Sequence, residues 1–149
     1  MKSEVYEKVK EFKKKYPMTL TWWRLKKHCR VIDDHLNPDE KVTYACAGQK
    51  NDRALDIFQT CVVVVTNKRL LIGSKRVTWG YFLNSITPDL FNDLKVAMGI
   101  IWGKIEIDTV KEVVNLSNLD RKSLDEIETK ITTFMIREKK KYGHGNKKS

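Results

Sequence analysis

Residues 58–75 read FQTCVVVVTNKRLLIGSK, and this stretch decides the kind of fold that the chain can adopt. Phe58–Thr66 is rich in β-branched residues, which favour strands, and it is apolar enough to be covered on both faces. Lys68–Ile72 predicts a second strand. Gly73-Ser74-Lys75 predicts a tight hairpin turn into a third strand, Arg76–Leu83. The stretch therefore predicts a domain built around short antiparallel strands.

More strands are predicted on the C-terminal side of this stretch. Pro88 interrupts the pattern, and Leu90–Met98 forms a weaker strand after it. Ile100–Ile107 follows, with one face made by Ile101, Gly103, Ile105 and Ile107. Thr109–Glu112 predicts a turn into a last strand, Val113–Leu116. With one strand before residue 58, the chain has seven short strands at hairpin spacing.

Two amphipathic helices are predicted before the strands. The first has one apolar face at helical spacing, made by Val5, Val9, Phe12 and Tyr16, and Pro17 ends it. The second follows a cap at Thr19 or Thr21, and its apolar stripe is Trp22, Leu25, Cys29, Ile32 and Leu36. Asn37-Pro38-Asp39 ends it as a turn. Val42–Ala47, closed by Gly48, is the expected first strand.

One helix is predicted after the strands. Ser123 and Glu126 have the spacing of a capping box, and Asp120 is an alternative cap. The apolar face of this helix is Leu124, Ile127, Ile131 and Phe134. The sequence turns basic beyond Met135. We expect a helical extension at 1–37, a strand-rich domain at 38–137 and a basic flexible tail at 138–149.

Several residues resemble a known family. Thr66-Asn67-Lys68-Arg69-Leu70-Leu71-Ile72, then Tyr81 and Ile86, then the strand Gly103–Ile107, resemble the bacterial PH-like domains, most closely the YokE-like group. The resemblance covers about residues 40–137. It implies an α+β fold in which a bent, seven-stranded sheet or barrel is capped by a C-terminal helix. It also implies a module without catalytic residues that tends to self-associate.

The first hairpin loop departs from what phosphoinositide-binding PH domains show. Those domains concentrate basic residues in this loop, whereas Gln49–Asp56 has two basic and two acidic side chains here. The sequence therefore argues against specific recognition of an inositide headgroup.

Positive charge is concentrated at the two ends of the chain. The net charge is +10, with +7 in residues 1–30, +5 in residues 137–149 and −2 in between. An anionic surface would attract these ends, unless they are simply solvated. The residues expected to contact such a surface are Lys13, Lys14, Lys15, Arg24, Lys27, Lys68, Arg69, Lys75, Arg76, Lys139, Lys140 and Lys141.

The sequence offers little for catalysis, metals or cofactors. Asp33-Asp34-His35 are consecutive on a predicted helix, so their side chains cannot converge on one atom. His28 and His35 are seven residues apart, which is not the spacing of a zinc helix. The three cysteines, Cys29, Cys46 and Cys61, sit in apolar patterns and are expected to be buried. We expect no enzyme, no metal and no cofactor, and no small-molecule substrate is identified.

Three functions remain for a non-catalytic binding module. The first is binding to a protein partner or to a second copy of the chain. The alternative is peripheral binding to an anionic membrane through the basic termini, where an exposed Trp23 could serve as an anchor. Nucleic-acid binding ranks last because no reading element is recognised. The charged N-terminal segment has no apolar run of a secretory signal, so a cytoplasmic protein is expected.

Overall fold

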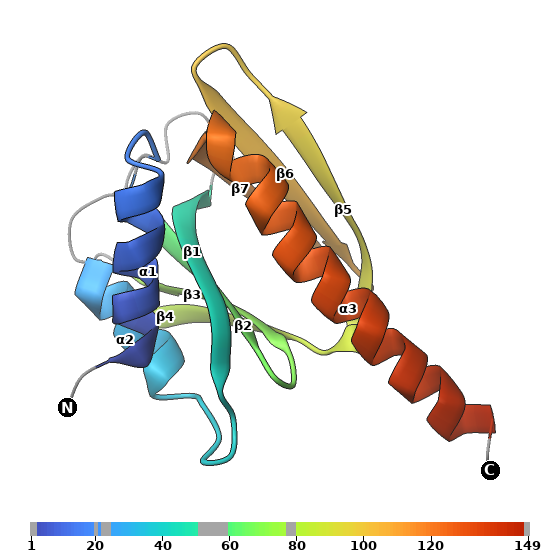
Figure 1. Ribbon diagram of the computed structural model, residues 1–149. Helices are drawn as coiled ribbons and strands as arrows, with labels where there is room; N and C mark the ends of the chain where they lie inside the picture. Colours follow the sequence, from blue (N-terminus) through green and yellow to red (C-terminus); the bar gives the residue numbers. More distant parts are fainter. Residues whose placement is uncertain (1–2, 20, 22–24, 51–59, 77–79, 148–149) are drawn as a thin grey trace.

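The computed structural model describes residues 3–19, 21, 25–50, 60–76 and 80–147, with side chains up to residue 141. Figure 1 shows two N-terminal helices, a strongly bent sheet and a long C-terminal helix. The elements are α1 (Glu4–Lys15), α2 (Leu25–Asp33), β1 (Val42–Lys50), β2 (Thr60–Thr66), β3 (Leu70–Lys75), β4 (Tyr81–Ile86), η1 (Pro88–Leu90), β5 (Phe91–Met98), β6 (Trp102–Thr109), β7 (Val113–Asp120), η2 (Arg121–Ser123) and α3 (Leu124–Lys147).

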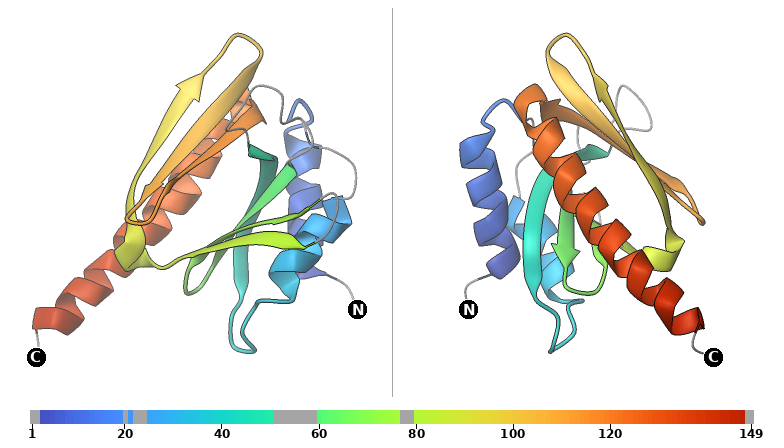
Figure 2. Two further views of the ribbon diagram at one scale, coloured as in Figure 1. Left: turned by 180° about the vertical axis from the view of Figure 1, so that it is seen from behind. Right: turned by 45° about the vertical axis from the view of Figure 1, so that its right-hand side comes forward.

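All seven strands belong to one antiparallel sheet with the order β4-β3-β2-β1-β7-β6-β5. Strand β1 meets β7 at its C-terminal end, where Gln49 and Lys50 pair with Ser117 and Leu116. From this seam the strands β1–β4 and β5–β7 diverge, and α3 crosses the opening between them (Figures 1 and 2). This is the predicted α+β, PH-like fold with a C-terminal helix and two preceding helices.

Strands β1–β3 are covered on both faces, which the apolar run around residue 62 predicts for β2. On the inner face, Cys61, Val63 and Val65 belong to the core that includes the buried face of α3. On the outer face, Val62 and Val64 pack in a second core with residues of α1 and α2. Every residue of β2 is buried. A strand between two cores has no face to keep polar, which explains the continuous valines.

The helix α1 is confirmed as the sequence predicts. Its four stripe residues are all buried, and the Ser3 hydroxyl caps the first turn by accepting from the N–H of Tyr6. In α2, Cys29 and Ile32 are buried as expected, whereas the predicted stripe residue Trp22 lies outside the described residues. The side chain of Thr19 is engaged elsewhere, because its Oγ1 accepts from the N–H of Asp120 at 2.9 Å.

Two glycines predicted to end strands lie inside them instead. Strand β1 continues through Gly48 to Lys50, and a Cβ at Gly48 would approach Leu119 Cδ2 to 2.9 Å. Gly73 lies within β3, where a Cβ would meet Ile32 Cγ1 at 2.9 Å. Both glycines serve close packing. The predicted turn at residues 73–75 and the predicted strand start at Arg76 are therefore wrong.

The actual turn between β3 and β4 starts at Arg76, and the next strand begins five residues later than predicted. Arg76 N–H donates to the carbonyl oxygen of Gly80, and Gly80 has a φ of +82°, a conformation that glycine adopts without strain. Strand β4 then begins at Tyr81.

The start of α3 also differs from the predicted capping box. Ser123 Oγ donates to the carbonyl oxygen of Asp120, and Asp120 Oδ1 accepts from the N–H of Lys122. Asp120 is thus the cap, which was the alternative, while Glu126 turns toward Lys15 and Tyr44. The apolar face of α3 is buried as predicted. The helix continues to Lys147, well into the segment expected to be a basic tail.

Candidate functional site

The predicted basic contact residues fall into separate groups. Lys13, Lys14 and Lys15 form the last turn of α1, next to the start of α3. Lys139, Lys140 and Lys141 lie near the other end of α3, far from the first group in each view (Figures 1 and 2). The two basic ends of the chain therefore do not make one surface. Arg24 lies outside the described residues, as does Trp23.

Arg69 is a structural residue. Its guanidinium donates to both carboxylate oxygens of Glu40 at 2.9 Å, to the carbonyl oxygen of His35 and to Ser85 Oγ. The side chain of Glu40 is fully buried. Burial raises the pKa of Glu40, but the hydrogen bonds from Arg69 and Thr66 outweigh burial and hold it below its usual range. The pair joins β3 to the segment that links α2 with β1.

The remaining predicted contacts are scattered. Lys68 forms an exposed ion pair with Asp39, at the opposite end of β3 from the β3–β4 turn. Arg76 is exposed and Lys75 is half-buried at that turn. Lys27 is exposed on α2. These cations do not gather with either terminal group.

Three exposed apolar side chains lie at the turn between β5 and β6. Ile100 is 93% exposed, Met98 59% and Ile101 56%. The turn is short, because Gly99 N–H donates to the carbonyl oxygen of Trp102 at 2.9 Å and Met98 pairs with Gly103. The sequence pattern placed Ile101 on one face of a strand, and this prediction is wrong because Ile101 lies in the turn before β6, which begins at Trp102.

Hydrogen bonds tie three distant chain segments together around this turn. Arg121 Nη1 donates to the carbonyl oxygen of Ile100 at 3.3 Å, and Nη2 lies 3.1 Å from Met98 Sδ. Trp102 Nε1 donates to the carbonyl oxygen of Met18 at 2.8 Å. Met18 N–H in turn donates to Asp120 Oδ2 at 3.2 Å. Met18 is thereby held beside the turn with 57% of its surface exposed.

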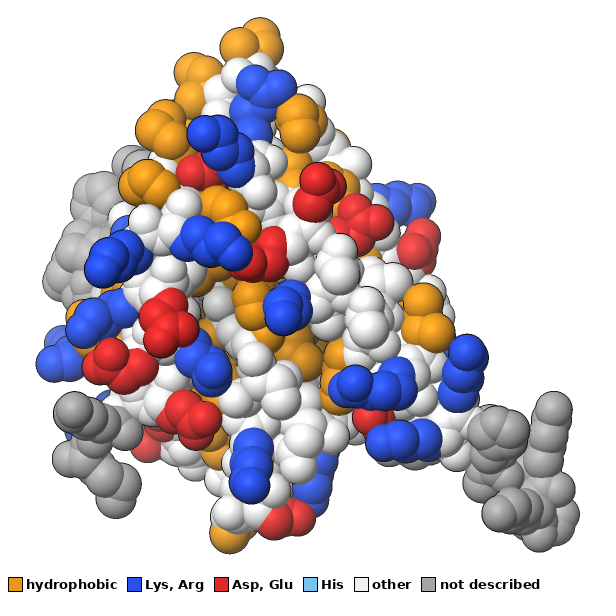
Figure 3. Space-filling model, in the orientation of Figure 1, with side chains coloured by type: hydrophobic (Ala, Val, Ile, Leu, Met, Phe, Trp, Pro, Cys, Tyr) orange, Lys and Arg blue, Asp and Glu red, His pale blue; other side chains and the backbone are white. Residues whose placement is uncertain are grey.

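We call residues 13–19, 98–104 and 120–122 the hairpin end. Its cations include Lys14, Lys104, Arg121 and Lys122, all exposed. Figure 3 shows apolar and basic side chains next to one another at this end of the molecule. Sequence reasoning missed the hairpin end. The available signal was the dipeptide Ile100-Ile101 at a position where hairpin spacing requires a turn, because turns usually carry Gly, Asn or Asp.

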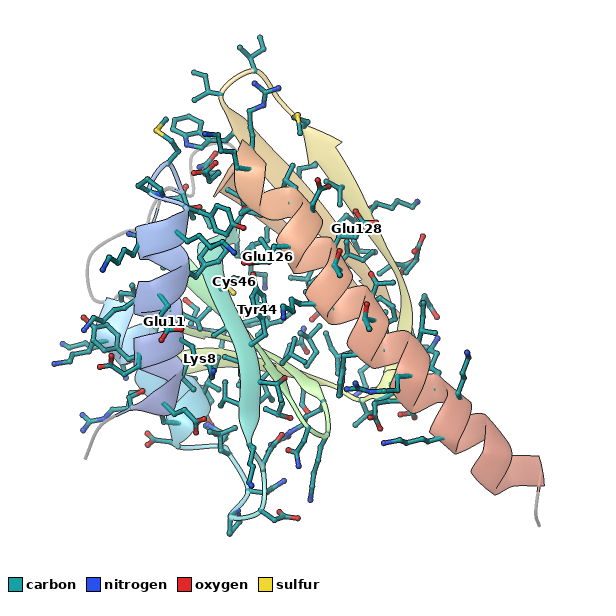
Figure 4. All side chains as sticks on the ribbon, viewed as in Figure 1. Lys8, Glu11, Tyr44, Cys46, Glu126 and Glu128 are labelled. Atoms are coloured by element: carbon teal, nitrogen blue, oxygen red, sulfur yellow. The ribbon has the colours of Figure 1, made fainter. Side chains whose placement is uncertain are left out.

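A small cleft of about 240 Å³ lies between α1, β1 and α3. Figure 4 shows Lys8 and Glu11 reaching it from α1, Tyr44 from β1 and Glu126 from α3. Glu126 accepts from Lys15 Nζ at 2.5 Å and from the Tyr44 hydroxyl at 3.0 Å. The cleft is smaller than the roughly 300–1,000 Å³ of pockets that hold drug-sized ligands.

Burial and hydrogen bonding shift the pKa values of Tyr44 and Glu126 in this cleft. Burial raises the pKa of the Tyr44 hydroxyl, which therefore stays protonated. Burial also raises the pKa of Glu126, but the hydrogen bonds from Lys15 and Tyr44 outweigh it and keep the carboxylate ionised. The contacts of this cleft hold α1 and α3 against β1, which is a structural role.

The cysteines and His35 are placed as structural residues too. All three cysteines are free and buried, as predicted, and burial raises the pKa of the Cys29 and Cys61 thiols to about 12. His35 contacts the carbonyl of Val31 and the hydroxyl of Tyr81. Among the described residues, no group of three ligating side chains is arranged to hold a metal ion. Nor does any described helix have the length and apolar character to cross a membrane.

Two solved structures are similar to this chain. One is a pleckstrin homology domain from Shewanella amazonensis SB2B, 16% identical with a TM-score of 0.44, covering 80% of this chain and 90% of that one. The other is a DUF1696 family protein with a pleckstrin-homology domain from Shewanella loihica PV-4. It is 16% identical with a TM-score of 0.46, covering 77% of this chain and 92% of that one. No curated protein sequence matches the chain significantly.

The family itself is defined by the sequence match. The family model described as Bacterial PH domain matches residues 36–133, which is well over half of the chain. The YokE-like group within these proteins stays a prediction. A PH-like fold supports a binding module at the coarse level. The match contains every strand of the sheet and most of the apolar face of α3, and the chain belongs to the bacterial PH domain family.

Proposed function

We propose that this chain is a non-catalytic module that attaches peripherally to anionic membrane surfaces through the hairpin end. The observation that carries the proposal is that exposed apolar and exposed basic side chains lie next to one another. Four exposed apolar residues, Met18, Met98, Ile100 and Ile101, stand among exposed cations at one end of the fold. Apolar groups rimmed by Lys and Arg suit the interface of a bilayer that contains anionic lipid.

The cations of the hairpin end are available for such a surface. Asp120 is 95% removed from solvent and is engaged by the N–H groups of Met18 and Lys122. Glu126 is neutralised locally by Lys15. Lys14, Lys104 and Lys122 remain exposed, and a cation near an anionic membrane contributes about 1 kcal/mol. The hairpin end thus has the charge that complements anionic headgroups.

This proposal changes the order of the functions ranked from the sequence. Protein binding and self-association had come first because of the family resemblance and the open sheet edges. Nucleic acid would complement the same cations but would give no reason for exposed isoleucine and methionine side chains. The membrane therefore accounts for both features of the hairpin end, whereas nucleic acid accounts for one of them.

The test is co-flotation of the protein with vesicles of phosphatidylcholine alone or mixed with phosphatidylserine, at low and at physiological salt. The expected result is binding to the anionic vesicles that weakens as salt rises. Replacing Lys14, Lys104 and Lys122 by glutamate is expected to weaken binding at least about 100-fold.

The matched control replaces Lys139, Lys140 and Lys141 by glutamate, which changes the net charge equally at the opposite end of α3. This control is expected to bind nearly as well as the wild type. If the control loses binding and the hairpin-end variant does not, the docking surface is wrong. If the wild type ignores anionic vesicles altogether, the membrane proposal fails, and the solution mass of the protein then tests self-association.

A further inference from the structure

The turn at Ile100 and Ile101 breaks the local rules that shape the rest of the sheet. Two-residue hairpin connections favour Asn-Gly or Asp-Gly because the turn requires unusual backbone angles, and β-branched residues are poor turn formers. Among the described residues, the positive φ values belong to Asn118 and Gly80, so neither isoleucine adopts the conformation of the favoured hairpin turns. A sequence that violates a local preference without a packing gain points to a function.

No packing gain is visible at this turn. Ile100 has 93% of its surface exposed, the largest value among the exposed apolar side chains. A polar residue at position 100 would remove little buried apolar surface, because the inner core is supplied in this region by Ile105 and Ile107 of β6. Packing within the fold therefore does not explain the two isoleucines, which points to a contact with another molecule.

The turn is also held in a defined shape. Arg121 donates from η2 to the carbonyl oxygen of Ile100, and its second amino group lies against Met98 Sδ. The N–H of Gly99 closes the turn by donating to the carbonyl oxygen of Trp102. The indole N–H of Trp102 donates in turn to the carbonyl oxygen of Met18. A side chain presented on a braced turn loses less conformational entropy on binding than one on a loose loop.

We infer that the Ile100–Ile101 turn inserts into the interfacial region of the bilayer, with the Arg121 guanidinium at the level of the lipid phosphates. This inference rests on the proposed membrane function and adds its mechanism. Charge brings the hairpin end to the surface, and insertion of the two isoleucines holds it there. The part of the binding energy that comes from insertion is independent of salt, because it comes from removing apolar surface from water.

The test compares two pairs of exposed, β-branched, apolar residues at opposite ends of β6. The test variant is Ile100→Ser with Ile101→Ser. The control variant is Val110→Ser with Val113→Ser, at the β6–β7 turn, where the valines are 64% and 46% exposed. Neither change alters net charge. We expect the test variant to bind phosphatidylserine-containing vesicles about 10- to 100-fold more weakly, and the control to bind like the wild type. Urea unfolding of both variants verifies the fold.

A depth measurement gives an independent readout. The native thiols are buried, so a fluorophore attached to Ile100→Cys reports position 100 alone, and Val113→Cys is its control. On anionic vesicles the probe at position 100 is expected to shift to the blue and to be quenched by nitroxide-labelled lipid acyl chains. The probe at position 113 is expected to do neither.

The outcomes separate this inference from the proposed function. If the wild type binds anionic vesicles but the Ile100→Ser/Ile101→Ser variant binds equally well and the probe is not quenched, insertion is refuted and electrostatic docking stands. If the wild type does not bind, both fall. A blue shift at position 100 that grows with protein concentration in the absence of vesicles would refute insertion in favour of contact between copies of the chain.

Discussion

The two halves of the bent sheet bury their residues in different ways. Strands β1–β3 lie between two cores, and every residue of β2 is buried. Strands β5–β7 bury one face under α3 and expose the other, so that β6 alternates between buried and accessible positions. The half without a free face supplies stability, whereas the half with a free face carries the exposed apolar turn. Substitutions in β1–β3 should therefore destabilise the fold, whereas substitutions on the free face of β5–β7 should cost it little.

The largest expected effect is a truncation between the two cores. Leu71 in β3 is fully buried against residues of α1 and α2. Leu71→Ala is expected to lower the free energy of unfolding by about 3–4 kcal/mol, because it removes apolar contacts and leaves a cavity. Urea denaturation measures the change. Its counterpart in the other half, Ile101→Ala, is expected to change stability by less than about 0.5 kcal/mol. Equal losses would abolish the distinction between the halves.

The next largest effect is expected from the ion pair between Arg69 and Glu40. Arg69→Ala leaves the buried Glu40 carboxylate without its partner and is expected to cost about 3 kcal/mol. Lys68→Ala, next to it in the chain, removes an exposed ion pair and is expected to cost less than about 1 kcal/mol. If Arg69→Ala unfolds like the wild type but binds anionic vesicles more weakly, Arg69 is a surface contact after all.

A smaller effect is expected where α3 crosses the sheet. A Cβ on Gly103 in β6 would approach Leu124 Cδ1 to 2.5 Å. Gly103→Ala is expected to cost about 1–2 kcal/mol through overpacking. Adding Leu124→Ala makes room for the methyl group, so the double variant should be more stable than the sum of the two single effects allows. Strict additivity in a double-mutant cycle would show that the two sites are not in contact.

Lowering the pH should reduce the stability of the fold, because the ionised Glu40 carboxylate becomes protonated. Its pKa is held below the usual value in the folded protein, so the stability it contributes is present above the unfolded-state pKa, about 4.3, and is lost as pH falls through the lower folded value. Glu40→Gln should remove this part of the acid dependence, which stability curves between neutral and acidic pH would reveal. An unchanged slope would assign the acid sensitivity to other carboxylates, such as Glu126.

The last prediction compares the two halves of the sheet by the rate at which a thiol in each of them is labelled. Cys61 in β2 is fully buried, and burial raises its pKa to about 12, so it should react with a thiol reagent at neutral pH through opening of the fold. A cysteine introduced at Ile100 should react at once. Rapid labelling of Cys61 in the native protein would mean that the first half opens readily.

Much of the fold could be predicted because periodicity reports local burial. The stripes of α1 and α3 and the two-sided strand β2 follow directly from the spacing of their apolar residues. The errors at Gly48 and Gly73 share one cause. A glycine required by close packing, against Leu119 in one case and Ile32 in the other, looks the same in sequence as a glycine required by a turn.

The candidate site could not be predicted because it depends on contacts between distant segments. The lysines at the end of α1 were visible, but nothing local connects them to Arg121 or to the β5–β6 turn. Alternation placed Ile101 in a strand because isoleucine favours strands and is unusual in a turn. The predicted contacts Arg69 and Lys15 carry charge as expected, yet each has a carboxylate partner in the fold.

The hydrogen bonds between Met18, Thr19 and Asp120 also set an order of events. They join residues about a hundred positions apart, and Trp102 reaches back to Met18 across 84 positions. Such long-range contacts form late, because the loop-closure entropy must be overcome before they contribute. During synthesis, Lys13–Met18 must therefore wait for residue 120 to emerge. A chain that ends before residue 120 therefore cannot display the hairpin end.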